Sequence, residues 1–434
     1  MAKDTELKLQ KAMIYSIFVR NYSEEGTFRA VEQDLARIKA LGTDYIWLLP
    51  IHPIGVKGRK GTVGSPYANQ DYRAINPDLG SVEDFEHLVN AIHEAGMKVM
   101  MDVVYNHTSP DSVLVEEHPE FFYRKPDGSM GNKLGDWTDV VDLDYSNVKL
   151  WFYQIETLKM WARFVDGFRC DVAPMVPIEF WQAAREAVRK VNPDCIWLAE
   201  SNESRFISFC HRHGIANFSD IEGYQAFDME YAYDTRDAFA GYLRGDRSLR
   251  AWLDVMNEQA AALDPHNVKL QFLENHDQPR IASFIKEDRS LRNFTAFLYF
   301  SKGAVLLYNG QEYETAHLPE LFEKDPISRS AEAGRDLSGL IARLARIRRE
   351  ILSETEFWHA EVEDEICTAV CYRSSKEHLT VGVFDLHVSV SEASFTVSVD
   401  VPDGTYQDEI SGKELSVSAG RMRFDGQPVI FRVR

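Results

Sequence analysis

Asp166-Gly-Phe-Arg-Cys-Asp171 (DGFRCD, residues 166–171) is the stretch on which the fold prediction rests. It closes an aromatic, β-prone run and places Arg169 and Asp171 two positions apart. Alternate residues of a β-strand share a face, so these two side chains should project together, with Phe168 and Cys170 on the opposite face. Two interpretations fit: a surface ion pair at a strand end, or an active-site pair at the carboxyl end of a barrel strand.

Three further apolar runs also end abruptly in polar side chains. One ends in residues 102–107 (DVVYNH), one in Glu200 directly after Trp197-Leu-Ala, and one in residues 272–277 (FLENHD). Continuous apolar strands separated by helix-like segments are typical of parallel β/α units. The closed eightfold version of this architecture carries its catalytic groups at the strand ends, which favours the active-site interpretation.

Taken in order, the four endings resemble the four signature regions of the α-amylase family, glycoside hydrolase family 13. Residues 65–72 (SPYANQDY) look like the family's substrate-platform segment, 139–144 (DVVDLD) resemble its fifth region, and 303–312 (GAVLLYNGQE) its last barrel strand. The resemblance covers roughly residues 12–350. Several linked motifs in the right order are far more specific than any one of them.

The resemblance implies cleavage of a glycosidic bond with retention, which needs one carboxylate as nucleophile and one carboxylic acid as proton donor. It assigns Asp171 as the nucleophile, Glu200 as the acid/base, and Asp277 as a third carboxylate that stabilises the oxocarbenium-like transition state. Taken singly, each has a structural alternative, such as an exposed loop carboxylate, and only the joint pattern favours catalysis. The substrate-binding residues that the resemblance implies are Tyr67, His107, Arg169 and His276.

Elementary electrostatics agrees with these two catalytic roles. Arg169, on the same strand face, is expected to keep Asp171 ionised by opposite charge. Glu200 follows three apolar residues, so we expect a less polar environment to raise its pKa, as an acid catalyst requires.

A calcium site is the only metal site that the resemblance suggests. Family α-amylases often bind calcium through an Asn that matches Asn106 and an Asp that matches Asp142. Calcium takes six to eight oxygens, and the sequence nominates only these two side chains. Asn106 also has a simpler reading, in which it orients His107. We therefore predict that no cofactor is required, with calcium an open alternative, and no cysteine–histidine spacing suggests zinc.

The predicted fold class is α/β: a (β/α)₈ TIM barrel with a short domain B after strand 3, at about residues 107–145, and a C-terminal antiparallel β-sandwich. The predicted domains are residues 1–354 and 355–434. Helical spacing is seen at residues 28–41, 82–95, 148–164, 178–191, 236–243 and 337–351. The charges of the last helix are expected to form a solvated face. In the sandwich, Asp403, Asp408 and Lys413 are expected at exposed turns.

Composition excludes several classes of protein. The net charge of −20 disfavours nucleic acid or an anionic membrane as a partner. The chain has no apolar run long enough to span a bilayer, and residues 1–11 lack the apolar core of a signal peptide. Its 5 cysteines form no CxxC pair, which favours free thiols and a reducing, cytoplasmic location.

The function predicted from these features is retaining hydrolysis of α-1,4-glucosidic bonds in maltodextrins or starch oligosaccharides. An α-glucan transglycosylase of the 4-α-glucanotransferase kind is the first alternative, and an α-1,6 linkage or a sucrose or trehalose donor also fits. A non-catalytic sugar-binding member of the fold is the third alternative, although such members typically lose catalytic carboxylates. The chain departs from many amylases at Pro174 and Met175, where those carry Lys-His for acceptor-side sugars.

Overall fold

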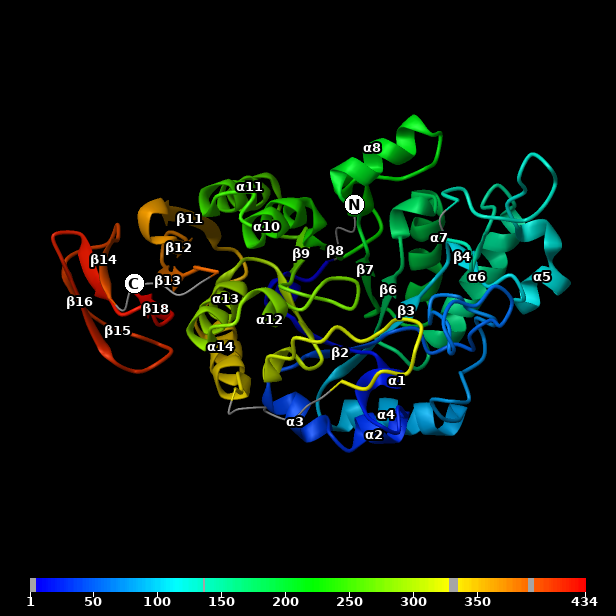
Figure 1. Ribbon diagram of the computed structural model, residues 1–434, viewed down its shortest axis with the longest axis horizontal. Helices are drawn as coiled ribbons and strands as arrows, with labels where there is room; N and C mark the ends of the chain where they lie inside the picture. The colour runs from blue at the N-terminus through cyan, green and yellow to red at the C-terminus, as the bar shows by residue number, and fades with distance from the viewer. Residues whose placement is uncertain (1–4, 136, 328–334, 389–393) are drawn as a thin grey trace.

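The computed structural model describes residues 5–135, 137–327, 335–388 and 394–434. Within them, eight parallel strands close into a barrel in the order β1-β10-β9-β8-β7-β6-β3-β2. Figure 1 shows the barrel with its helices beside a smaller β-structure that contains the C-terminus, which confirms the predicted fold class. The barrel strands are β1 (Met13–Ile17), β2 (Tyr45–Leu48), β3 (Lys98–Val103), β6 (Gly167–Cys170), β7 (Ile196–Ala199), β8 (Met229–Tyr231), β9 (Val268–Gln271) and β10 (Ala304–Tyr308).

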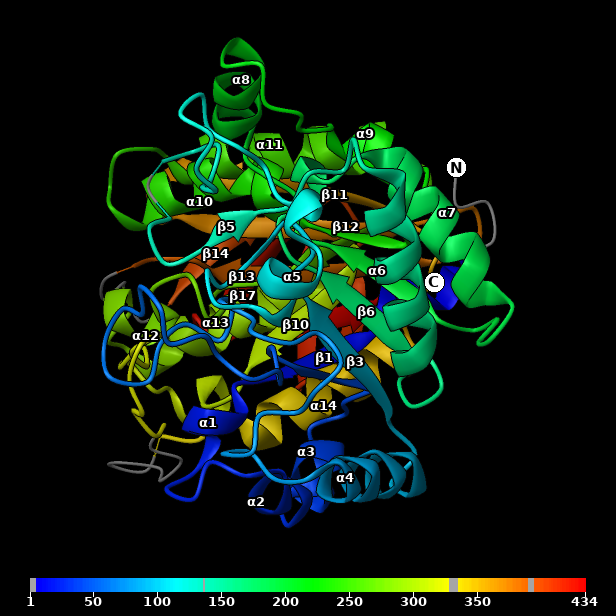
Figure 2. The same cartoon turned by 90° about the vertical axis from the view of Figure 1, so that its right-hand side faces the viewer.

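Helices surround the barrel, as the turned view in Figure 2 shows. Their bounds are α1 (Val19–Tyr22), α2 (Phe28–Glu32), α3 (Leu35–Ala40), α4 (Val82–Glu94), α5 (Val113–Glu117), α6 (Val148–Trp161), α7 (Ile178–Arg189), α8 (Ser204–Arg212), α9 (Asp220–Gly223), α10 (Arg236–Leu243), α11 (Leu249–Ala262), α12 (Ile281–Phe284), α13 (Asp288–Phe300) and α14 (Ser338–Glu350). In the described part of the chain, no helix combines the length and the apolar character needed to cross a bilayer.

The single helix predicted over residues 28–41 is wrong, because the structure has two short helices there, α2 and α3. Asp34 separates them with a backbone of φ −109° and ψ 4°. Its carboxylate accepts a hydrogen bond of 2.9 Å from Nε of Arg37. The backbone N–H of Asp34 donates to the carbonyl of Val31 at 3.1 Å, a bond three residues back that closes α2 with a tighter turn and interrupts the α-helical hydrogen bonding.

The prediction of a solvated charged face on the last helix is wrong for Arg348 of α14. This residue is only 1% exposed, and its guanidinium donates to the carbonyls of Ser301 and Gln10 at 2.9 and 2.8 Å. A buried arginine that meets backbone carbonyls is satisfied without a carboxylate partner. The helix therefore ties the first and last barrel segments together.

Two long helices, α11 and α13, are absent from the sequence prediction. In α13, the residues from Asn293 to Phe300 are all buried, so this half of the helix has no polar face to create a period. In α11, the buried residues Leu249, Trp252, Leu253 and Met256 do follow helical spacing, a signal that the prediction did not use.

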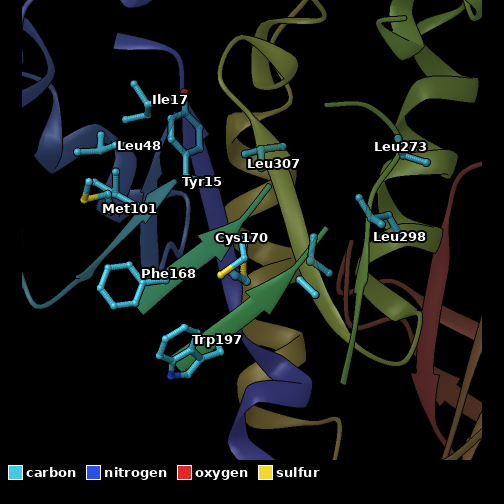
Figure 3. Packing of buried hydrophobic residues seen from close by; sticks show 14 of the residues in the cluster. Tyr15, Ile17, Leu48, Met101, Phe168, Cys170, Trp197, Leu273, Leu298 and Leu307 are labelled. Carbon is cyan, nitrogen blue, oxygen red and sulfur yellow. The ribbon is translucent and has the colours of Figure 1, made fainter. Parts of the chain in front are cut away.

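The barrel has an inner core and an outer core. Side chains such as Trp47, Met100 and Leu198 fill the interior. Residues of the opposite alternation, including Phe168 and Cys170 of β6, belong to the second, outer cluster, and Figure 3 shows these two with Met101 and Trp197 of the neighbouring strands. The predicted alternation around residue 169 is therefore confirmed, and Arg169 is left on the inner face of β6.

The excursion after β3 is small. It contains β4 (His107–Thr108) and β5 (Val141–Asp142), which pair antiparallel, with α5 and a 3₁₀ turn between them. His107 lies directly opposite Asp142 in this pairing. The short domain B therefore begins and ends beside two of the residues that the sequence singled out.

The C-terminal region contains two antiparallel four-stranded sheets in its described part, in the orders β11-β12-β13-β18 and β14-β17-β16-β15. Their facing sides share a valine-rich core that includes Val370, Val383 and Val417. The predicted boundary between the barrel domain and the C-terminal domain, between residues 354 and 355, stays a prediction. The strands are β11 (Phe357–Glu363), β12 (Thr368–Ser374), β13 (Leu379–Asp385), β14 (Phe395–Ser398), β15 (Gly404–Gln407), β16 (Glu414–Ser418), β17 (Arg421–Phe424) and β18 (Val429–Arg432).

One predicted exposed turn residue, Asp408, is in fact 4% exposed. Its carboxylate accepts hydrogen bonds from the backbone N–H groups of Ser411 and Ile430 at 2.9 and 3.0 Å. It therefore organises the turn between β15 and β16 and joins this turn to β18 of the other sheet.

Candidate active site

The predicted site residues meet at the carboxyl ends of neighbouring barrel strands. Arg169 on β6 lies opposite Asp102 on β3 in the strand register. Asp171 follows β6 directly, and Glu200 follows β7 directly. Asp277 lies on the loop after β9. In parallel barrels, side chains at these strand ends face one common opening.

Arg169 is the centre of this cluster. Its Nη1 lies 3.0 Å from Oδ1 of Asp102 and 2.7 Å from Oδ1 of Asp171. Its Nη2 lies 2.9 Å from Oε1 of Glu200, although no N–H of Nη2 is aligned well enough for a hydrogen bond there. One guanidinium therefore contacts three carboxyl groups through two of its nitrogens.

Aromatic rings enclose the guanidinium. Its central carbon lies 5.2 Å from the ring centre of Trp47, 5.7 Å from that of Tyr67 and 5.5 Å from that of Tyr231. Burial alone would lower the pKa of Arg169, but the charges of Asp102 and Glu200 raise it well above its usual value. The arginine is thus a permanent cation in a water-poor site.

Burial dominates the titration of the two central carboxyl groups. It raises the pKa of Asp171 to about 6, against the opposing charge of Arg169 and with the like charge of Asp102. It raises the pKa of Glu200 to about 7, again against Arg169 and with the charge of Asp171. The expectation that Arg169 keeps Asp171 fully ionised is therefore too simple, because burial outweighs it. The expected rise at Glu200 is confirmed.

Val172, next to Asp171, holds Glu200 through its backbone. Its N–H donates a hydrogen bond of 2.8 Å to Oε2 of Glu200. The residue has φ 36° and ψ 42°, a left-handed conformation that is rare for a β-branched side chain. This strained turn aims a main-chain donor at the carboxyl group and fixes its orientation.

Asp277 differs from the other carboxyl groups because its side chain is 39% exposed. Its Oδ2 lies 2.9 Å from Nε2 of His276. Although burial opposes the charge, the charge and hydrogen bond of His276 lower the pKa of Asp277. Asp277 is thus an ionised carboxylate at the edge of the cluster.

Tyr67 and His276 form one wall of the site. Their rings stack with centres 5.5 Å apart and planes 11° apart, and the Tyr67 hydroxyl lies 2.5 Å from Nε2 of His276. The same hydroxyl donates to Oδ2 of Asp102 at 3.1 Å. Both predicted binding residues are therefore tied to the carboxyl cluster.

His107 lies in a different part of the site, beside domain B. Its ring packs against Trp137 with the ring centres 5.5 Å apart. Burial lowers the pKa of His107, against the charge of Asp142, so the imidazole is neutral. Nδ2 of Asn106 donates to Nδ1 of His107 at 3.1 Å, in agreement with the orienting role considered for Asn106.

The two nominated calcium ligands do not by themselves form a site for that ion. Oδ2 of Asp142 accepts the backbone N–H of Lys133 at 2.8 Å, and Asn106 is engaged with His107. Calcium requires six to eight oxygens. Among the residues that the structure describes, no group of three or more His, Cys, Asp or Glu side chains is arranged to hold a metal ion.

Three contributors to the site were missed by the sequence prediction. Asp102 and Tyr231 both contact Arg169, the latter through a hydrogen bond of 3.3 Å from Nε to the tyrosine hydroxyl. Asp102 begins a motif already quoted, so alternation along its strand could have indicated it. The backbone of Val172 gave no signal, because sequence does not reveal a positive φ at a valine.

Comparison with known families gives two matches. Residues 13–127 and 134–338 match the model of the α-amylase catalytic domain, and residues 359–431 match the model of the bacterial α-amylase C-terminal domain. The first match covers most of the chain and every strand of the barrel.

Solved structures are similar over nearly the full length. An α-amylase from Lactobacillus plantarum has 43% identity and a TM-score of 0.93, covering 98% of this chain and 100% of that one. The maltogenic α-amylase AmyB from Thermotoga neapolitana has 33% identity and a TM-score of 0.85, covering 98% and 99%.

One relative is named as a transferase rather than an amylase. The α-1,4-glucan:maltose-1-phosphate maltosyltransferase of Arcanobacterium haemolyticum is 36% identical over 197 residues. That match covers 41% of this chain but only 28% of the relative, so the chain matches less than a third of that protein's length.

Proposed function

The chain belongs to the α-amylase family, which acts on α-glucan oligosaccharides, and from that premise we propose that it hydrolyses α-1,4-glucosidic bonds with retention. The substrates proposed are maltodextrins and starch oligosaccharides. The observation that carries the proposal is the contact of one buried guanidinium with both Asp171 and Glu200. A retaining pair stands about 5 Å apart, a separation that a shared guanidinium allows.

The proposed first step transfers the sugar to the enzyme. Asp171 attacks the anomeric carbon and forms a glycosyl ester, while the glycosidic C–O bond breaks and Glu200 gives its proton to the leaving oxygen. Arg169 donates a hydrogen bond to Asp171 but only a charge contact to Glu200, which supports this division because the hydrogen bond favours the ionised form of Asp171.

The proposed second step releases the sugar. Glu200, now a carboxylate, takes a proton from water, and the oxygen of that water attacks the anomeric carbon and breaks the ester bond. Asp277 is proposed to bind sugar hydroxyls because it is ionised and is the most exposed carboxylate of the cluster. Tyr67, His107 and His276 are proposed to contact the same glucose.

Transfer to a second sugar is the competing function. It is favoured by the maltosyltransferase relative. Pro174 and Met175, which stand where many amylases carry Lys-His for acceptor-side sugars, are buried and leave the acceptor preference open. A time course with maltoheptaose separates the two. We expect only shorter products. Products longer than maltoheptaose, formed early and in quantity, would show that transfer rather than hydrolysis is the main activity.

We also propose a reducing, cytoplasmic location, which points to imported oligosaccharides as substrates. The support is that all five cysteines are free and four of them are buried. Buried free thiols are typical of proteins from reducing compartments.

A further inference from the structure

A basic cavity lies at the end of the barrel opposite the candidate active site. Lys98 begins β3, and Asp102 lies near the other end of the same strand. Both side chains share the alternation of Met100, which faces the barrel interior. Four residues of strand span about 13 Å, so Lys98 and Asp102 lie at opposite ends of this interior. A ligand bound beside Lys98 would therefore be separate from the mouth.

The cavity is large enough for a small molecule and is lined mainly by positive charge. Its volume is about 320 Å³, and small-molecule sites typically have about 300–1,000 Å³. Its charged lining residues are four cations and one carboxylate: Lys8, Lys11, Lys98, Arg349 and Asp44. Such a surface is unexpected in a chain with a net charge of −20. Clefts lined by one sign of charge concentrate ions of the opposite sign.

Two of the four cations already have carboxylate partners. Nη2 of Arg349 lies 2.7 Å from Oδ1 of Asp44, and Oδ2 of Asp44 accepts the backbone N–H of Met13 at 3.0 Å. Nζ of Lys11 lies 2.8 Å from Oε1 of Glu354 and donates to two backbone carbonyls. Both oxygens of the lining carboxylate are therefore occupied, and neither can neutralise another cation fully.

The other two cations, Lys98 and Lys8, are available to a ligand. In the described part of the chain, Nζ of Lys98 has neither a hydrogen-bond acceptor nor a carboxylate partner, and it lies 5.9 Å from the ring centre of Tyr45. Lys8 contacts Glu6, but these side chains are 65% and 55% exposed, and an ion pair so exposed contributes little. An anion in the cavity can therefore contact both ammonium groups at little cost.

The remaining wall of the cavity indicates the kind of anion. Leu9, Ala12 and Tyr45 line it and are 2%, 5% and 4% exposed, so this wall is packed and apolar. Lysine ammonium groups bind phosphate as point charges. An apolar wall beside two of them suits an organic body that carries one compact, multiply charged group. The same positive charge disfavours a metal cation.

We propose that this cavity binds a small phosphorylated molecule. Lys98 and Lys8 hold the phosphate, and the body of the molecule packs against Leu9 and Ala12. A neighbouring cavity of about 360 Å³ also has Lys8 and Lys98 in its lining, which leaves room for a larger body. This binding site does not depend on the reaction proposed for the mouth.

The test is calorimetric titration of the full-length chain with phenyl phosphate, which carries a phosphate on an apolar ring and contains no sugar that could enter the mouth. At pH 8 the phosphate is a dianion, and we expect one saturable site per chain. Lys98→Met keeps an unbranched stem without the charge and should raise Kd about tenfold or more. Lys149→Met, at an exposed position of α6, is the matched control and should leave Kd unchanged. Phenol should not bind.

A second measurement on the wild-type chain does not depend on how a variant folds. Acetylation of lysines, mapped by peptide mass spectrometry, should slow at Lys98 and Lys8 when phenyl phosphate is present, and should stay unchanged at Lys149. Absence of a saturable site, or unprotected Lys98 and Lys8, would overturn the proposal. Equal weakening of binding in Lys98→Met and Lys149→Met would also overturn it, because general attraction to lysines would then explain the binding.

Discussion

The barrel holds two clusters in which one buried cation lies among three carboxyl groups. At the mouth, Arg169 contacts Asp102, Asp171 and Glu200. On the outer face, Lys269 of β9 pairs with Asp220 and Asp234 and lies beside Glu230 of β8. Both clusters combine one buried cation with three carboxyl groups. The first cluster faces the barrel interior at the strand ends, and the second faces the helices.

The two clusters differ in how their carboxyl groups are satisfied. At the mouth, Glu200 has a backbone donor and an arginine contact. On the outer face, Glu230 is fully buried, and neither of its oxygens has a hydrogen-bond partner in the described part of the chain. Burial raises the pKa of Glu230 well above its usual value, against the opposing charge of Lys269. Charge composition alone therefore does not distinguish the candidate active site from the outer cluster. The active site is distinguished by its position at the strand ends, beside aromatic and imidazole groups.

The largest expected effect is a contrast between one residue of each cluster. Asp171→Asn should lower kcat on maltotriose by about 10⁴-fold or more, because the attacking charge is lost. Asp220→Asn should leave kcat within about threefold of wild type, because it is remote from the reacting bond, and should cost about 1–3 kcal/mol of stability. Steady-state kinetics and thermal melts measure both. Comparable activity losses in the two variants would remove the distinction between the clusters.

The pH dependence of activity sharpens the comparison. The reactive form needs Asp171 ionised and Glu200 protonated, so kcat/KM should follow a narrow bell with limbs near about 6 and about 7. Asp102→Asn removes a like charge that raises the pKa of Asp171, so the acid limb should move to lower pH. The control Asp234→Asn should leave both limbs in place. An acid limb that does not move in Asp102→Asn contradicts the proposed coupling.

A smaller effect, on stability alone, is expected at Glu230. Its folded-state pKa lies above the unfolded value of 4.5, so folding binds a proton between these two values and stability falls as pH rises above about 4.5. Glu230→Gln removes this titration. The difference in melting temperature between Glu230→Gln and wild type should therefore grow in favour of the variant from pH 4.5 to pH 8. Activity should be unchanged. A gain that is constant across this range would show that Glu230 does not titrate on unfolding.

The smallest expected effect is that of a chelator. If Arg169 rather than a metal ion organises the mouth, dialysis against a chelator should leave both the rate on maltotriose and the melting temperature nearly unchanged. The motivation is that the amide nitrogen of Asn106 and Oδ2 of Asp142 are engaged by neighbouring protein groups. Oδ1 of Asp142 has no hydrogen-bond partner among the described residues, but calcium takes six to eight oxygens. A large loss that added calcium restores would show that further oxygen ligands exist.

Sequence reading recovered the barrel because its strands are continuous apolar runs that end in polar groups, such as the run that ends at Glu200. Linked motifs nominated Asp171 and Asp277, which the structure places after barrel strands at the same end of the barrel, and their roles stay predictions. It missed features that depend on three-dimensional context. Arg348 resembles a solvated helix charge until the carbonyls that surround it are known. The positive φ of Val172 likewise depends on the turn that it completes.

The most direct test of the central claim is to trap the glycosyl-enzyme in Glu200→Gln. With α-maltosyl fluoride, the departing fluoride needs no proton donor, so the first step should proceed. The second step lacks its base, so the ester should accumulate. Mass spectrometry of the intact chain should show one added maltosyl group, and peptide mapping should place it on Asp171. The double variant Asp171→Asn, Glu200→Gln is the matched control and should show no adduct. An adduct on another residue, or unimpaired turnover of maltotriose by Glu200→Gln, would contradict the account.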